Sequence, residues 1–166
     1  MPSHDFGSPE LFSFSDGFVT VASVPLDRRL EFVELEKKNA KDIKPFRIVI
    51  DNFRTLHSFG IFFDNVPVGE VSAWHFLGEG VVNLSFWVDE DFRRKGVAFS
   101  AVKQMCSFLM EKYQKDVYAH VLPTNTASSQ LLFKLGFVSI SSIVINTADG
   151  MKVHNTWVLR RDNANL

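Results

Sequence analysis

The most informative segment of the sequence is Val88–Ala98, VDEDFRRKGVA, where a strand-like run ends, a turn follows and the best helical pattern of the chain begins. The start of a helix leaves about four backbone N–H groups without partners, and these carry a partial positive charge. Gly96 has no Cβ, so another group could approach this backbone closely. The three residues before Gly96 are cationic. The segment therefore indicates a site for a pyrophosphate, with contributions from Arg93, Arg94 and Lys95.

A simpler interpretation of this segment stays open. A basic turn before a helix is often only solvated, and a single glycine there often serves only the turn. The segment is not the phosphate-binding loop of nucleotide hydrolases, because G-x-x-x-x-G-K-[ST] occurs nowhere in the sequence. It is not a dinucleotide-binding fingerprint either, since only one of the three glycines is present.

Outward from this segment, hydrophobic periodicity predicts the other elements. Gly96–Tyr113 has one apolar face and is expected to be a long helix. Three strand-like runs before it are separated by tight-turn residues and predict an antiparallel meander. The expected strands are Phe18–Val24, Ser58–Asp64, Val66–Leu77, Val81–Val88, Val117–Val121, Val138–Asn146 and Met151–Arg160. The other expected helices are Leu26–Asn39, an irregular one from Ala40 to Phe53 that contains Pro45, and Asn125–Leu135.

This order of elements predicts an α/β (α+β) fold. One long helix joins the strand Val81–Val88 to the strand Val117–Val121, which should make them a parallel pair with a right-handed crossover. Tight turns connect most of the other strands. We therefore expect a mixed, mostly antiparallel central sheet of about seven strands, flanked by helices on both faces.

A second informative segment is Asn125–Phe137, NTASSQLLFKLGF, which follows a strand. Asn is a favoured residue at a helix N-terminus, so Asn125 has a purely structural explanation as a cap. Ser128 lies one turn further along nearly the same face, and an ordinary polar helix position would explain it as well. Lys134 near the helix end is explained by the helix dipole, and Gly136 by the usual C-terminal cap.

Together, the two segments resemble a known family. R-x-x-G-x-A after a strand, followed about 30 residues later by N-x-x-S-x-x-L-x-x-K-x-G-F, is similar to the GCN5-related N-acetyltransferases. The sequence looks most like the branch of the ribosomal-protein N-terminal acetyltransferases (RimJ/RimL-like). The matching residues are Arg93, Gly96, Ala98, Asn125, Ser128, Leu131, Lys134, Gly136 and Phe137. The element order from Phe18 to Arg160 fits the rest of that fold.

The resemblance implies a splayed parallel strand pair that binds acetyl-CoA as the acyl donor, without a metal. Phe86, Trp87 and Val88 would pair with the pantetheine arm through their free backbone edge, and the thioester would lie near a bulge around Ser85. Asn125 would bond the same arm. The pyrophosphate would be held by the backbone of Arg94, Lys95, Gly96, Val97 and Ala98 with help from Arg93 and Ser100, and Ser128 and Lys134 complete the implied cofactor site.

The resemblance also implies direct attack of an amine on the thioester, without a covalent enzyme intermediate. Orientation, a backbone N–H donor for the oxyanion and proton transfers would then supply the catalysis. Many members carry a Tyr acid in the second helix, but this sequence has Leu132 and Phe133 there, so Ser128 is the better candidate acid. The candidate bases are His120, Glu70, His75, His154 and a relayed water. An ordinary core or surface role would also explain each of these side chains.

The composition bounds the organisation of the chain. Its 166 residues, net charge of −1 and one cysteine suit one domain without a disulfide or a Cys-based zinc cluster, and argue against nucleic-acid binding. With neither a secretory signal nor an apolar window near the roughly 20 residues of a membrane helix, we expect a cytoplasmic protein without a membrane partner. Residues 1–15 are expected to be a flexible arm and residues 16–162 a single acyl-CoA N-acyltransferase domain. The 17 Phe residues leave room for a homodimer interface.

Three functions stay open on the sequence alone. The first is an N-acetyltransferase that moves an acetyl group to a protein N-terminus or a small-molecule amine through a ternary complex. The second is a transferase that uses another acyl-CoA or acts on a hydroxyl, and the third is a non-catalytic acyl-CoA-binding domain. Cofactor binding is common to all three, so only transfer to amines separates them.

Overall fold

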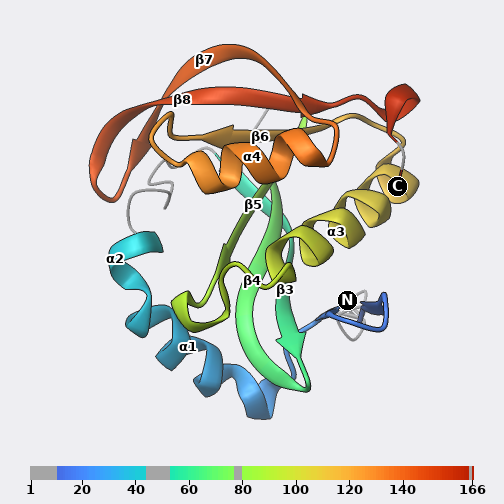
Figure 1. Ribbon diagram of the computed structural model, residues 1–166, viewed down its shortest axis with the longest axis vertical. Coiled ribbons are helices and arrows are strands. Elements are labelled where there is room, and N and C mark those ends of the chain that lie inside the picture. Colours follow the sequence, from blue (N-terminus) through green and yellow to red (C-terminus); the bar gives the residue numbers. More distant parts are fainter. Residues whose placement is uncertain (1–10, 44–52, 77–79, 165) are drawn as a thin grey trace, which may run out of the picture.

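The computed structural model describes residues 11–43, 53–76, 80–164 and 166. Their strands form one eight-stranded sheet with the order β1-β2-β3-β4-β5-β6-β8-β7 (Figure 1). Neighbouring strands are antiparallel except β5 and β6, which are parallel as expected. The strands are β1 Ser13–Ser15, β2 Thr20–Ala22, β3 Phe53–Phe63, β4 Val66–Phe76, β5 Val82–Val88, β6 Val117–Val121, β7 Val138–Thr147 and β8 Gly150–Leu159.

Helices cover both faces of the sheet. The helices are α1 Arg29–Lys38, α2 Ala40–Ile43, α3 Val97–Tyr113 and α4 Thr126–Lys134. Successive side chains of a strand point to opposite faces, and in β3 Ile61 belongs to the core beside α3, whereas Phe62 packs against Phe32 of α1. A Cβ at Gly60 would lie 2.5 Å from Phe32 Cζ, so glycine here lets α1 approach the sheet closely. Figure 1 shows α3 and α4 together in front of the sheet.

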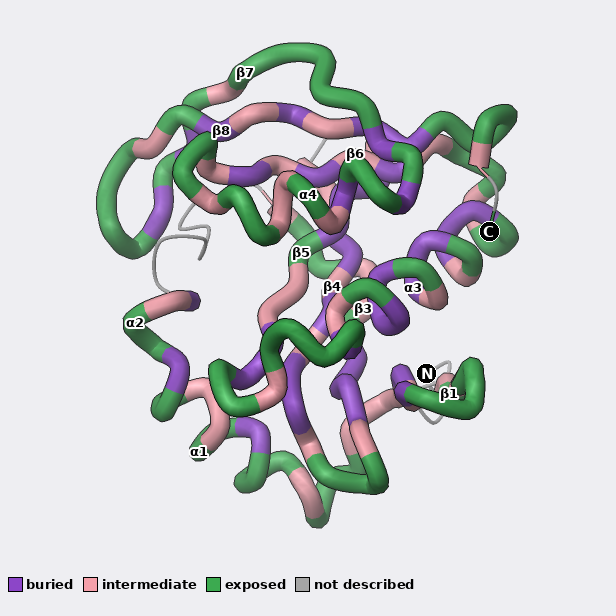
Figure 2. Tube along the Cα trace, viewed as in Figure 1, coloured by how far each residue is buried: buried purple, intermediate pink, exposed green. Residues whose placement is uncertain are grey.

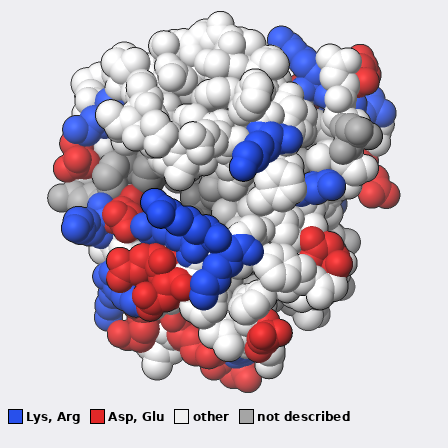
Figure 3. Space-filling view, viewed as in Figure 1, with Lys and Arg blue, Asp and Glu red and all other residues white. Residues whose placement is uncertain are grey.

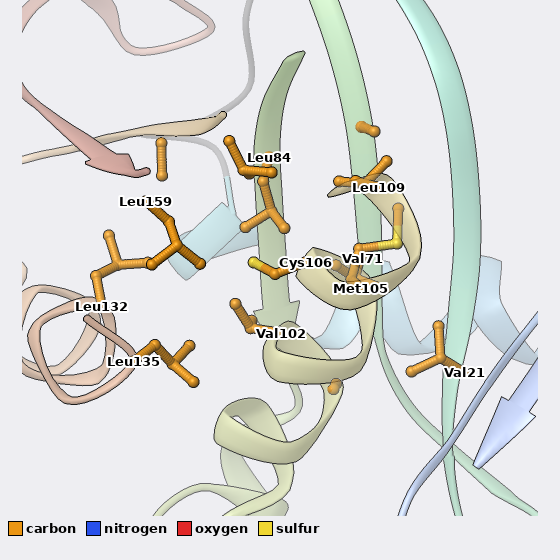
Figure 4. Packing of buried hydrophobic residues seen from close by; sticks show 14 of the residues in the cluster. Val21, Val71, Leu84, Val102, Met105, Cys106, Leu109, Leu132, Leu135 and Leu159 are labelled. Atoms are coloured by element: carbon orange, nitrogen blue, oxygen red, sulfur yellow. The ribbon is translucent and has the colours of Figure 1, made fainter. Parts of the chain in front are cut away.

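The hydrophobic core lies between the sheet and α3. The predicted apolar face of α3 is confirmed, because Ala101, Met105 and Leu109 are fully buried, and Figure 4 shows Met105 and Leu109 near Val71 of β4. Cys106 is also fully buried, and burial raises the pKa of its thiol to about 12. This thiol is therefore a small core group and not a nucleophile. Exposed residues dominate the outermost strand β7 (Figure 2).

The strand count and the start of β3 differ from the sequence-based expectation. Ser13–Ser15, expected within the loose arm, form β1 because Phe12 and Phe14 pack against Phe108 with ring centroids 5.1 and 5.3 Å apart. Residues 1–10 of that arm lie outside the described residues. The described part of the irregular helix is α2, Ala40–Ile43, and its expected continuation through Pro45 lies in the undescribed range 44–52. β3 begins at Phe53, five residues earlier than predicted, because its first half pairs with β4.

No helix among the described residues combines the length and the apolar character that crossing a membrane requires.

Candidate functional site

The parallel pair β5–β6 opens into a gap. The two strands pair over three residues, Val82 with Val117, Asn83 with Tyr118 and Leu84 with Ala119. Beyond this point, β5 keeps its pairing with β4, and β6 keeps its pairing with β8. The strands therefore separate from each other, and the predicted splay is present.

A hollow that is open to solvent lies at this gap. It is lined from both strands and from the helix that follows β6. The lining residues are Trp74, Leu84, Ser85, Phe86, Ala119, His120, Val121, Asn125, Ser128, Ile145 and His154. The register of β4 and β5 is unbroken from Gly69 to Trp74, so the bulge expected around Ser85 is wrong. The gap arises from the divergence of β6 instead.

The gap leads to the start of α3, where the backbone offers hydrogen-bond donors. Gly96, the residue before α3, has φ of 79°, and no side chain caps the helix. The first backbone bond of the helix runs from the Ser100 N–H to the Gly96 carbonyl, so the N–H groups of residues 97–99 have no partner among the described residues. A Cβ on Gly96 would have Phe18 Cε1 as its nearest neighbour, at 3.9 Å. This start of the helix is therefore open and suits an anion.

Two residues predicted to help bind phosphate have partners within the protein. The Arg93 guanidinium donates to Asp42 of α2 at 2.9 Å and to the Val88 carbonyl at 3.1 Å. The Ser100 hydroxyl donates to the Asp16 carboxylate in the β1–β2 turn. These bonds hold neighbouring elements against the loop, and they do not favour a direct phosphate contact by either side chain.

The side chains of Arg94 and Lys95, next to Arg93 in the chain, are less constrained than that of Arg93. Arg94 and Lys95 are exposed, and neither forms an ion pair with any described residue. Arg94 also has a positive φ of 61°, so the loop turns sharply just before Gly96. Figure 3 shows Lys and Arg side chains gathered over this part of the molecule, next to a group of Asp and Glu. The predicted local cationic patch is thus formed mainly by these two residues.

The C-terminal end of α1 fixes the loop between β5 and α3. Asn39 is buried, and its side-chain N–H donates to Asp89 Oδ1 at 3.0 Å while its oxygen accepts from the Glu90 N–H at 3.0 Å. Lys38 binds both Asp89 and Asp91. Burial alone would raise the pKa of Asp89, but the hydrogen bonds from Asn39 and Lys38 outweigh it and lower this pKa. The carboxylate is therefore ionised and anchors the loop. No local sequence pattern signals this cluster, because Asn39 and Asp89 lie 50 positions apart in the chain.

The start of α4 brings Asn125 and Ser128 to the hollow, as predicted. Asn125 Oδ1 accepts from the Ser128 backbone N–H at 3.2 Å, so Asn125 is a helix cap. This bond uses only the oxygen of the amide, and the nitrogen has no hydrogen-bond partner among the described residues. Lys134 lies at the opposite end of α4 and is exposed, so its cofactor contact stays a prediction. At the same end, Gly136 has φ of 97° and is the expected C-terminal cap.

His120 lines the hollow, but both of its ring nitrogens have partners. Nε2 lies 2.9 Å from Asn83 Oδ1, and Nδ1 lies 3.0 Å from the Thr156 hydroxyl. Exchanging the two ends of the Asn83 amide would reverse donor and acceptor and still engage both nitrogens. Burial and the nearby His154 lower the pKa of His120 to about 4. These contacts do not favour His120 as the base.

Of the other candidate bases, only one lies at the hollow. His154 lines the hollow, whereas Glu70 and His75 do not. Glu70 accepts a hydrogen bond from Trp87 Nε1 at 3.3 Å. Ile145 is a lining residue that the sequence pattern did not single out, because nothing in a hydrophobic strand pattern distinguishes a wall residue from a core residue. Among the described residues, no three His, Cys, Asp or Glu side chains group closely enough to bind a metal ion.

An open mixed sheet with a splayed parallel pair and a glycine-led helix beside the gap defines the fold of the GCN5-related N-acetyltransferases. The family model described as an acetyltransferase (GNAT) domain matches residues 26–138. The chain belongs to this family and is an acyltransferase. The family resemblance found in the two sequence motifs is therefore confirmed.

Solved structures share this fold at low sequence identity. RimJ of Mycobacterium smegmatis, in complex with CoA-disulfide, is 13% identical with a TM-score of 0.76, and the match covers 89% of this chain and 84% of that one. The ribosomal-protein-S5-alanine acetyltransferase of Vibrio fischeri is 14% identical with a TM-score of 0.74, covering 93% and 100%. The microcin C7 self-immunity acetyltransferase MccE, in complex with acetyl-CoA and AMP, is 12% identical with a TM-score of 0.68, covering 88% and 93%. Among curated proteins, no sequence matches this chain.

Proposed function

We propose that this protein transfers an acetyl group from acetyl-CoA directly to a primary amine, with an exposed peptide N-terminus as the favoured acceptor. The observation that carries the proposal is the open end of β5 beside the uncapped start of α3. An extended ligand with a pyrophosphate at one end can use both features at once. Acetyl-CoA has this shape and charge, and two similar structures bind CoA-disulfide or acetyl-CoA.

The donor binds in three parts. Backbone N–H groups of residues 94–98 hold the pyrophosphate, and Arg94 and Lys95 supply charge. The pantetheine arm adds to the edge of Phe86–Val88 that β6 leaves unpaired, as an extra strand would. The nitrogen of the Asn125 amide bonds this arm, and the thioester then lies in the hollow.

The chemistry of the hollow favours an acceptor with a single amine. Its described lining residues include no carboxylate, so nothing there would pair with a second ammonium group. A peptide N-terminus meets this condition, and one similar structure is a ribosomal-protein-S5-alanine acetyltransferase. Holding the amine and the thioester in one geometry supplies up to roughly 7–11 kcal/mol of the barrier reduction.

The test of the function is amine-dependent release of free thiol from acetyl-CoA. The acceptors are a set of decapeptides that differ only in the first residue, with spermidine and kanamycin as small-molecule amines. Each peptide is paired with a copy that has a blocked N-terminus. We expect release with unblocked peptides only, and mass spectrometry should locate the acetyl group on the α-amine. Release with the blocked copies, or with no peptide at all, contradicts the proposal.

A matched pair of variants tests the phosphate site. Gly96→Asp and Gly96→Asn place side chains of the same size at a residue with positive φ, where Asn and Asp are the best-tolerated replacements. Only Asp adds a negative charge beside the expected phosphates. Calorimetry should show acetyl-CoA binding to Gly96→Asp weakened about tenfold more than binding to Gly96→Asn, which corresponds to about 1.4 kcal/mol. Equal affinities would place the phosphates elsewhere.

A further inference from the structure

The gap between β5 and β6 has two different sides. Side chains alternate along a strand, so on β6 Ala119 and Val121 face the core beside α3 and α4, whereas His120 faces the opposite side. His120 pairs with Thr156 of β8, which places Thr156 and His154 on that same opposite side. The donor-binding residues of α4 and the two histidines therefore meet the hollow from opposite faces of the sheet.

His154 differs from His120 in its hydrogen bonds. Its side chain is buried, with 2% of its surface exposed, and it lines the hollow. Its Nδ1 lies 3.0 Å from the Lys152 carbonyl, and because a carbonyl only accepts, Nδ1 carries the hydrogen. In the neutral ring, Nε2 then carries the lone pair, and the only hydrogen bond that His154 forms with the described residues is the one from Nδ1.

We propose that Nε2 of His154 is the general base that takes the proton from the acceptor amine, an inference that rests on the proposed acetyl transfer. His154 combines three properties: it lines the hollow, its tautomer is fixed by a backbone carbonyl, and its second nitrogen is available. Among the candidate bases, His120 lacks the available nitrogen, and Glu70 and His75 do not line the hollow.

The electrostatics agree with this role. Burial lowers the pKa of His154, and the bond to the Lys152 carbonyl only partly opposes this, so the ring is neutral at pH 7. On β6, His120 faces it and is also neutral because its pKa is about 4. On β8, Lys152 shares the same face two residues away, and its ammonium lies 3.6 Å from Asp149. No carboxylate belongs to the described lining of the hollow, so the neutral ring of His154 has no negatively charged group beside it there to compete for the proton of the amine.

The proposed step balances as follows. The amine nitrogen forms a bond with the thioester carbonyl carbon, the C–S bond breaks, and CoA leaves as the thiolate. His154 Nε2 takes one proton from the attacking nitrogen. The thiolate takes a proton from water, either directly or through the Ser128 hydroxyl, which receives a proton from water as it donates its own, and His154 later returns its proton to the solvent.

The experiment uses the best decapeptide found in the thiol-release assay and measures kcat between about pH 5 and about pH 9. For the wild-type protein we expect the plot of kcat against pH to show an acidic limb. Its apparent pKa should lie below the ordinary value of about 6.5 for His and should be distinct from the pKa of the peptide amine, near about 8. His154→Asn keeps a donor for the Lys152 carbonyl and lacks Nε2. It should lower kcat by about 100-fold or more, remove the limb and leave acetyl-CoA binding within about twofold, and added imidazole should restore part of the rate. His120→Gln should retain the limb, whatever its rate.

The outcomes separate the two proposals. If the wild-type protein acetylates no acceptor, the proposed function fails. If the wild-type protein is active, and if His154→Asn is folded and keeps both its kcat and the acidic limb of its pH profile, only the assignment of His154 is overturned. If circular dichroism shows that His154→Asn does not fold, NMR titration of the wild-type ring decides: a pKa equal to that of the kinetic limb, with the hydrogen on Nδ1, supports the base, and a mismatch overturns it.

Discussion

At the scale of single residues, Ser128 and its neighbour Ser129 have similar side chains and different surroundings. The Ser128 hydroxyl lines the hollow and has no hydrogen-bond partner among the described residues. The Ser129 hydroxyl donates to the Asn125 carbonyl at 3.0 Å, within the first turn of α4. The two serines therefore form a natural matched pair for testing which hydroxyl reaches the leaving thiolate.

Ser128→Ala is expected to lower kcat by about tenfold or more, because the thiolate loses a nearby proton donor. Acetyl-CoA affinity should change by less than about threefold, since the backbone contacts of the donor persist. Steady-state kinetics with the decapeptide acceptor measures both quantities, and Ser129→Ala, which removes a hydroxyl that faces the helix, should leave the rate unchanged. A full rate in Ser128→Ala would mean that water protonates the thiolate.

The sequence predicted residue positions better than residue partners. The helix start at Gly96, the cap at Asn125 and the position of Ser128 one turn further along α4 all follow from local spacing, and the structure confirms them. The partners of Arg93 and Ser100 could not be predicted, because Asp42 and Asp16 lie 51 and 84 positions away in the chain. Only the folded arrangement brings these carboxylates to the loop.

At the scale of elements, α4 depends on a residue with two roles. The Asn125 oxygen caps the helix, while the proposal gives its nitrogen a bond to the pantetheine arm. Asn125→Ala should remove both roles and lower the free energy of unfolding by about 1 kcal/mol. Asn125→Ser keeps a cap and lacks the amide nitrogen. It should therefore restore most of the stability and leave acetyl-CoA binding weakened.

Urea unfolding and calorimetry on the same samples separate the two roles. If Asn125→Ser recovers both the midpoint of unfolding and the affinity, Asn125 is a cap and nothing more. If neither variant changes the affinity, the pantetheine contact is absent.

Elements with a strong local period were predicted well, and those that depend on distant contacts were not. α3 and β6 match their predicted ranges closely because their apolar patterns are regular. β1 has three residues, too few for a pattern, and it forms because Phe12 and Phe14 contact an aromatic cluster on β3 and α3. Similarly, the first half of β3 carries polar residues and is a strand because β4 pairs with it.

At the scale of the whole molecule, four titratable groups that line or anchor the gap all have lowered pKa values. The pKa of His120 falls to about 4 by burial, and burial also lowers the pKa of His154. The pKa of Asp89 and of Asp16 is lowered by hydrogen bonds that outweigh burial. In each case the unfolded chain binds protons more readily than the folded protein as the pH falls. Acid therefore destabilises the fold through the same residues that line or anchor the gap.

The window of pH follows from these shifts. Above the ordinary pKa of His, about 6.5, both states are neutral at His120 and the group does not change stability with pH. Between that value and about 4, the unfolded chain gains a proton that the folded protein does not, so stability falls as the pH falls. The two carboxylates add to this loss only at lower pH, where the unfolded chain begins to protonate them.

We expect the free energy of unfolding to decrease steadily from pH 6.5 to pH 4.5, with His120 contributing a slope of up to about 1.4 kcal/mol per pH unit. His120→Gln removes this titration and should give a shallower slope over the same window, whatever its stability at pH 8. Urea unfolding of both proteins at several pH values measures the two slopes, and the range above pH 7 is the internal control, because the slopes should coincide there. Equal slopes below pH 6.5 would show that His120 is solvated and charged in the folded protein. The inference that His120 is a neutral residue in the wall of the hollow would then be wrong.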